Sequence, residues 1–245
     1  LPSSTVRTTV CAPALPAGAQ TVVRTVLDGN GDVALRSTFV AGLPHGPMSV
    51  FHGAGVPAME AGYRLGLPHG AMRLYDEGGN LLQDAQREAG LAEGLTRTYY
   101  PSGKPMHEQR YLRGVRNGEG IAYAESGDVV ARTHHLAGRL EGDASYYSDG
   151  RLVLRERYRG GVLDGETCAY APSGELAQSS PYRAGLLHGP LKRYWPNGQV
   201  MEEIVYRAGK PVGQPRRFDA AGREIAGGAA PKGFMTSLEK LVKGG

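Results

Sequence analysis

Apolar and polar residues alternate in short runs along most of the chain, and clusters of glycine separate the runs. Alternation with a period of two is typical of β-strands that have one face against apolar neighbours and the other in water. Glycine favours the turns between such strands because it accepts a positive φ angle without steric cost. The pattern therefore predicts a meander of β-hairpins.

The hairpins recur with a period of 24 residues, except for one step of 23 residues between Gly138 and Gly161. Each repeat contains two glycines separated by three residues, and a third glycine lies eleven residues before the next pair. Such a fixed period indicates a repeat array in which each unit contacts its neighbours. The first glycines of the pairs are Gly42, Gly66, Gly90, Gly114, Gly138, Gly161, Gly185 and Gly209.

Two aromatic ladders follow the glycines. The first ladder stands three residues before the first glycine of each pair: Phe39, Tyr63, Arg87, Tyr111, His135, Tyr158, Tyr182 and Tyr206. The second ladder stands five residues after the second glycine: Phe51, Tyr75, Tyr99, Tyr123, Tyr147, Tyr170, Tyr194 and Phe218. In the strand that enters each pair, an apolar residue such as Leu81 lies six positions before the ladder and is expected on its face. We expect one aromatic and aliphatic face, along which the two ladders interleave as a stripe, and one charged face.

The predicted fold is all-β: an elongated, twisted, single-layer antiparallel sheet of about eight tandem hairpins, or about 17 strands, with a short C-terminal helix. Residues 1–22 form an N-terminal extension with a short strand around Val6–Val10, and residues 23–225 form the repeat array. Residues 226–245 contain a linker and an amphipathic helix at Phe234–Val242, which would cap the open end of the sheet or lie on its apolar face.

The charge balance excludes some partners. The chain has 28 basic and 24 acidic residues, and a net charge of +4 is too small to indicate nucleic-acid binding. The excess lies between Pro190 and Gly245, where there are ten basic and five acidic residues. No apolar run approaches the ~20 residues that cross a bilayer. The chain begins at Leu1 with no visible signal peptide, which is compatible with a trimmed, exported protein.

The two cysteines, Cys11 and Cys168, are too few for a disulfide framework or a zinc site. They either form one disulfide in an oxidising compartment or are two unrelated thiols. His45, His69 and His188 occupy equivalent positions before the second glycine, but equivalent residues of adjacent repeats would be ~10 Å apart, too far to share a metal ion. We expect them to be polar residues in tight turns.

The sequence contains no motif of nucleophilic or zinc-dependent hydrolysis, and its glycines open onto strands rather than onto a phosphate-binding helix. We therefore predict a protein that is not an enzyme, with no cofactor, no bound metal and no small-molecule substrate.

The unit Y-x-x-G-x-x-x-G-x-x-x-x-Y-x-x-x-G, as in Tyr182, Gly185, Gly189, Tyr194 and Gly198, resembles the MORN repeat, and more closely the bacterial variant of YwqK-type antitoxin proteins. The resemblance covers roughly Val23 to Ile225. It implies a binding protein that neutralises a cognate bacterial toxin, such as a secreted lipase effector. The alternative that it implies is a membrane-associated scaffold on anionic lipid. The expected location is the periplasm, with the cytoplasm as the alternative.

Arg87 and His135 interrupt the first ladder, and a local break or a specific contact is expected there. An aromatic surface rimmed by charge is typical of interaction sites. The residues predicted to bind the partner are Tyr75, Tyr99, Tyr111, Tyr123, Tyr147, Tyr158, Tyr170, Tyr182, Tyr194, Arg87, His135, Lys192 and Arg216.

Overall fold

The structure is a computed structural model, and it describes residues 18–225. The predicted strand at Val6–Val10 and the predicted helix at Phe234–Val242 lie outside the described residues. Within residues 18–225 the fold is all-β, with 21 strand segments, antiparallel pairing throughout and a single short 3-10 turn, η1 (Gly53–Gly55). Four of the expected 17 or so strands are each divided into two segments, which accounts for the higher count.

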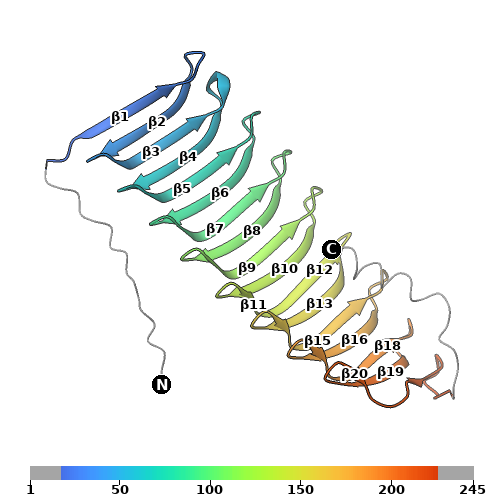
Figure 1. The fold of residues 1–245 in the computed structure, drawn as a ribbon. Helices are drawn as coiled ribbons and strands as arrows, with labels where there is room; N and C mark the ends of the chain where they lie inside the picture. Colours follow the sequence, from blue (N-terminus) through green and yellow to red (C-terminus); the bar gives the residue numbers. More distant parts are fainter. Residues whose placement is uncertain (1–17, 226–245) are drawn as a thin grey trace, which may run out of the picture. The chain divides into compact units, whose positions relative to one another are not determined.

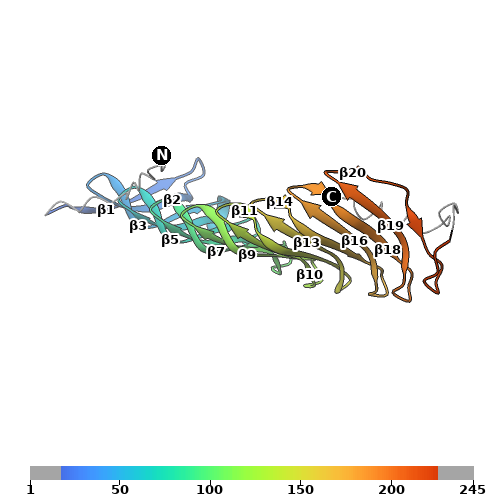
Figure 2. The same cartoon turned by 90° about the horizontal axis from the view of Figure 1, so that it is seen from below.

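The described chain divides into two units, and β13 (Arg151–Arg159) and β14 (Val162–Leu163) fall at the division. In the first unit the strands lie side by side in chain order as a single layer (Figures 1 and 2). Its strands are β1 (Thr21–Leu27), β2 (Val33–Val40), β3 (Leu43–Phe51), β4 (Pro57–Arg64), β5 (Leu67–Tyr75), β6 (Leu81–Glu88), β7 (Leu91–Tyr99), β8 (Pro105–Leu112), β9 (Val115–Tyr123), β10 (Val129–Leu136), β11 (Arg139–Leu140) and β12 (Gly142–Ser148).

The second unit follows the same plan, and its strands also pair in chain order. They are β15 (Gly165–Tyr170), β16 (Leu176–Arg183), β17 (Leu186–Leu187), β18 (Gly189–Tyr194), β19 (Val200–Arg207), β20 (Lys210–Pro211) and β21 (Arg216–Arg217), together with the middle of β13.

The first glycine of each pair closes a two-residue hairpin. Between Arg64 and Leu67, which pair across β4 and β5, Leu65 has φ 49° and Gly66 has φ 85°. Two consecutive positive φ angles define a type I′ turn, whose twist matches that of the strands. The residue before the glycine is therefore held in the left-handed region in almost every repeat: Ala41, Leu65, Ala89, Arg113, Ala137, Gly160, Ala184 and Ala208.

The second glycine lies across from a ladder residue of the next repeat. Gly46 pairs with Tyr63, and in the second unit Gly189 pairs with Tyr206. Glycine is favoured there because the backbone adopts a positive φ angle, 94° at Gly46 and 118° at Gly189. The spacing between the second glycine and the next ladder residue thus reflects their pairing across neighbouring strands.

Hydrogen bonds join the turns of consecutive repeats. The Gly66 N–H donates to the Pro44 carbonyl over 2.8 Å, and the Gly209 N–H donates to the Leu187 carbonyl over 2.8 Å. The polar residue before the second glycine adds a further bond, because its side chain accepts the N–H of the left-handed residue one repeat later. Glu93 Oε2 accepts from Arg113 N over 2.8 Å. The same bond forms from Leu65 to His45, from Ala137 to Asn117, from Gly160 to Glu141 and from Ala208 to His188.

The expectation that these histidines lie in tight turns is wrong for His45, which lies within β3, whereas His188 lies between β17 and β18. They are acceptors for the turn of the following repeat. At the opposite ends of the strands, side chains also reach one repeat ahead: Tyr100 Oη donates to the Tyr123 carbonyl over 2.8 Å, and Trp195 Nε1 donates to the Phe218 carbonyl over 3.0 Å. Hydrogen bonds between repeats therefore form at both ends of the strands.

Candidate binding surface

The two ladders lie on opposite faces of the sheet. Tyr63 is three residues from Glu60 along β4, so their side chains point to opposite sides. The hydroxyl of Tyr75 donates to Glu60 Oε2 over 2.8 Å, which places Tyr75 on the side of Glu60. We call the side of Tyr63 face A and the side of Glu60 and Tyr75 face B. The expectation of a single aromatic stripe is therefore wrong.

The second unit has the same arrangement. The hydroxyls of Ser179 and Tyr194 lie 3.2 Å apart, and Ser179 occupies the repeat position of Glu60. Tyr182 is three residues from Ser179 and so lies on the other face. Burial raises the pKa of Tyr182, and the nearby Glu156 carboxylate and Tyr206 hydroxyl add to the effect. In each unit the first ladder therefore runs along one face and the second along the opposite face. We also call these faces A and B in the second unit, by the ladder that each carries.

A β-bulge explains why the sequence pattern misleads here. Leu74 pairs with Gln83, but the next residue, Tyr75, pairs with Leu81, so Leu82 is an extra residue. Two consecutive residues of β6 then lie opposite one residue of β5, so the alternation of side chains between the two faces cannot be counted through the bulge. The expectation that Leu81 and its equivalents share the face of the first ladder therefore has no support. The same shift precedes Phe51, Tyr99, Tyr170 and Tyr194.

The predicted binding residues divide between the faces. All nine tyrosines and Arg87 are half-buried, His135 is buried with 7% of its surface exposed, and Arg216 is exposed. Face A carries Arg87, Tyr111, His135, Tyr158 and Tyr182. Face B carries Tyr75, Tyr99, Tyr123, Tyr147, Tyr170, Tyr194, Lys192 and Arg216.

Face B balances most of its own charge. In the first unit, cross-strand ion pairs join Arg97 to Glu108 over 2.7 Å and Arg132 to Glu119 over 3.0 Å. In the second unit Lys192 and Arg216 both lie within 4 Å of Glu203, over 3.7 and 3.6 Å. The two basic residues predicted to contact a partner are therefore already paired with carboxylates. The remaining polar feature of face B is the line of tyrosine hydroxyls.

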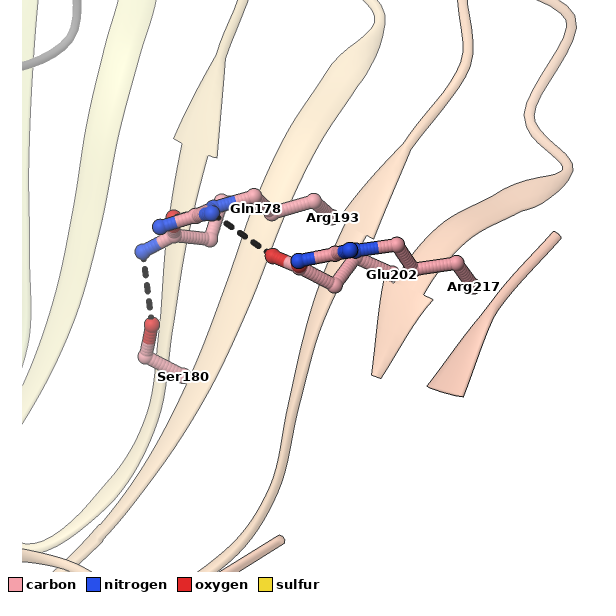
Figure 3. A network of polar contacts seen from close by, with 5 residues as sticks. All are labelled: Gln178, Ser180, Arg193, Glu202 and Arg217. Carbon is pink, nitrogen blue, oxygen red and sulfur yellow. Dashed lines mark hydrogen bonds and ion pairs between the residues drawn. The ribbon is translucent and has the colours of Figure 1, made fainter. Parts of the chain in front are cut away.

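Face A of the second unit contains a polar network that the sequence analysis missed (Figure 3). Glu202, which is 6% exposed, accepts hydrogen bonds from Arg193 over 2.7 Å and from Arg217 over 3.1 Å. Gln178 accepts from Arg193 over 3.2 Å and donates to Ser180 over 2.9 Å. In the first unit no acidic residue or arginine occupies the repeat positions of Glu202 and Arg217, which hold, for example, Met59 and Leu74. That departure from the repeat pattern is the signal that could have revealed the network.

Face A of the first unit is polar where the ladder is interrupted. Burial lowers the pKa of His135, and the positive charge of Arg116 and the neighbouring His134 and His107 lower it further. Two buried atoms, His135 Nδ1 and Gln109 Oε1, have no hydrogen-bond partner among the described residues. His135 is therefore a neutral, packed residue at neutral pH.

Within residues 18–225, no three His, Cys, Asp or Glu side chains gather as a metal site would require. Cys168 is buried in β15. Cys11 lies outside the described residues, so the two alternatives, one disulfide or two unrelated thiols, both stay open. A search of the described residues finds no helix with the length and apolar character needed to cross a membrane.

Comparisons with known proteins support the repeat assignment. The model of the MORN repeat variant family matches residues 92–112 and 187–208. Both segments begin two residues after the first glycine of a pair, so the family model and the glycine pattern agree on the phase. These two segments are therefore similar to the MORN repeat variant.

A search of curated proteins returns no match. Among solved structures, the chain is similar to a chain in the crystal structure of TcdB2-TccC3-Cdc42, with 13% identity and a TM-score of 0.23. That similarity covers 81% of this chain and 13% of the other.

Proposed function

We propose that this protein is a non-enzymatic binding scaffold, and more narrowly an immunity protein that binds and neutralises a cognate bacterial protein toxin. The observation that carries the proposal is the pair of tyrosine ladders on opposite faces of a single-layer sheet. No other described element covers either face (Figure 2). The tyrosines are half-buried by their neighbours, and one part of each ring remains accessible.

Tyrosine suits protein recognition because its ring offers a large, rigid contact area at low cost in conformational entropy, and its hydroxyl can bond to a polar partner. Face B presents at least four such rings over consecutive repeats, Tyr75, Tyr99, Tyr123 and Tyr147, among balanced charges. A standard protein interface buries ~800 Å² on each partner, which several adjacent repeats can supply. An extended surface of this kind favours a macromolecular partner over a small molecule.

The narrower proposal, a toxin as partner and the periplasm as location, rests on the resemblance of the repeat unit to YwqK-type antitoxins. Its test is binding to the purified product of the adjacent reading frame. We expect a stable complex by calorimetry, and protection of cells that express that product. Absence of both binding and protection would reject the immunity role.

Matched variants locate the binding face in the same experiment. Tyr111→Ser changes face A and Tyr123→Ser changes face B within neighbouring strands. A partner held by one face loses at least tenfold in affinity with one variant and little with the other. Circular dichroism of each variant controls for loss of folding.

A membrane scaffold is the competing proposal, motivated by the basic C-terminal repeats. Four of those basic residues are paired with carboxylates: Lys192, Arg193, Arg216 and Arg217. Pairing with Glu202 and Glu203 makes these four side chains less available to anionic lipid, so we rank this proposal second. If the protein co-sediments with phosphatidylserine vesicles at low salt and this binding is lost at high salt, the membrane scaffold becomes the first-ranked proposal.

A further inference from the structure

We propose that β1 is the interface of a homodimer, in which the β1 strands of two copies pair antiparallel and extend the sheet across a two-fold axis. This inference concerns self-association and does not depend on the identity of a toxin.

The strand β1 is an open edge. It pairs with β2 on one side, and no described strand pairs with its other side. All seven of its residues are exposed, and four are large and apolar: Val22 at 47%, Val23 at 63%, Val26 at 52% and Leu27 at 55%. An edge strand presents a row of unpaired backbone N–H and C=O groups, which is a template for another strand.

The last strand of the array is protected by contrast. The segment β21 is two residues long, and both residues are arginines. Arg216 is paired with Glu203 and Glu224, and Arg217 with Glu202. Short length, charge and nearby proline (Pro211 and Pro215) are the devices by which proteins block addition to a sheet edge. None of these devices is found within β1 itself, apart from the charge of Arg24.

The composition of β1 favours an identical strand as its partner. The strand β1 has valine on both sides: Val22 and Val26 flank Arg24 on one side, and Val23 lies on the other. The β1 strand of a second copy would therefore place apolar side chains beside those of the first on both sides of the sheet. With the two-fold axis at Thr25, Thr25 faces its counterpart, Val23 faces Leu27 and Arg24 faces Val26. This register pairs β-branched and apolar residues and keeps the two arginines from facing each other.

A two-fold contact is closed, so it yields a dimer and not a fibre. The contact is one strand wide and lies below the area of a standard interface, which predicts a weak dimer. We expect an association that depends on protein concentration, with a dissociation constant in the micromolar range.

Sedimentation velocity of the full chain over a range of concentrations tests the proposal. We expect the dimer fraction to rise with concentration in the wild type. The double variant Val23→Lys/Val26→Lys should stay monomeric, because it places a charge on each side of the strand. The matched control is Val205→Lys on β19, which is also exposed, at 44%, and should dimerise like the wild type.

Hydrogen exchange supplies the second readout, because amides of β1 should gain protection as the dimer forms. Three results would overturn the proposal: a monomer at every soluble concentration, an unchanged dimer in the lysine variant, or association that Val205→Lys abolishes. Protection of β1 amides in a persistent monomer would show that another part of the same chain covers the edge, and would overturn it too.

Discussion

The carboxylate of Glu202 offers a sharp test of how the second unit is held together. Its side chain is 8% exposed and contacts Arg193 over 2.7 Å and Arg217 over 3.1 Å. Glu202→Ala would leave two guanidinium groups side by side, each on a side chain 28% exposed, without a counter-charge. Removal of one member of a buried ion pair costs ~3–5 kcal/mol. Partial exposure of both arginines lets water screen them, so we expect about 2–3 kcal/mol here.

The matched control is Glu224→Ala. Glu224 accepts from Arg216 over 2.9 Å, but the two side chains are 51% and 54% exposed. Because solvent screens such a pair, its loss should lower the unfolding free energy far less than Glu202→Ala does. The comparison therefore separates the effect of burial from the effect of charge pairing.

The assay is urea unfolding followed by circular dichroism, together with hydrogen exchange resolved to β18 and β19. Exchange is needed because repeat arrays can open locally before they unfold completely. Glu202→Ala should lower the unfolding midpoint and speed exchange in these strands. If Glu202→Ala destabilises the protein no more than Glu224→Ala does, burial does not strengthen the ion pairs of Glu202 and the expected difference is refuted. A triple replacement, Glu202→Leu with Arg193→Met and Arg217→Met, should recover most of the loss.

Three further predictions concern contacts within and between repeats. The pKa of His135 is lower in the folded state, so its contribution to stability is present above about pH 6.5 and is lost as the pH falls below that value. His135→Tyr should remove this part of the pH dependence of the unfolding free energy. Gly120→Ala should cost ~1–3 kcal/mol in urea unfolding, because a Cβ atom there would lie 2.6 Å from Gln109 Oε1. Trp195→Phe should cost ~1 kcal/mol, since it removes the hydrogen bond to the Phe218 carbonyl, and an unchanged midpoint would show that this bond is not needed.

The repeat period was sufficient to predict the hairpins and their turns. Gly66 and its equivalents adopt the positive φ angles that the spacing requires, and β4 and β5 pair around that turn as expected. The face of Leu81 was not predictable by counting back from Arg87, because the bulge at Leu82 breaks the alternation within β6. A one-residue bulge leaves no clear trace in a pattern of apolar and polar residues.

The polar network around Glu202 was missed for a different reason. Averaging over repeats emphasises what the repeats share, whereas Glu202 and Arg193 differ from the residues in the earlier copies. Opposite charges that appear in only a few repeats become meaningful when they pair across neighbouring strands, and Arg193 and Glu202 are direct partners in β18 and β19. Reading each position as a row across repeats would have revealed the pair.

The acceptor before each second glycine indicates where the array stops. Glu93 and His188 each serve a turn one repeat later, but Val212 has no polar group, and residues 213–225 contain no further type I′ turn for it to serve. Glu93→Ala should therefore cost about 1 kcal/mol and speed exchange of the Arg113 amide, because that N–H loses its acceptor. Val212→Glu, which restores the shared residue type, should change stability by less than ~0.5 kcal/mol. Equal and opposite effects of the two substitutions would mean that the acceptor acts within its own turn and not between repeats.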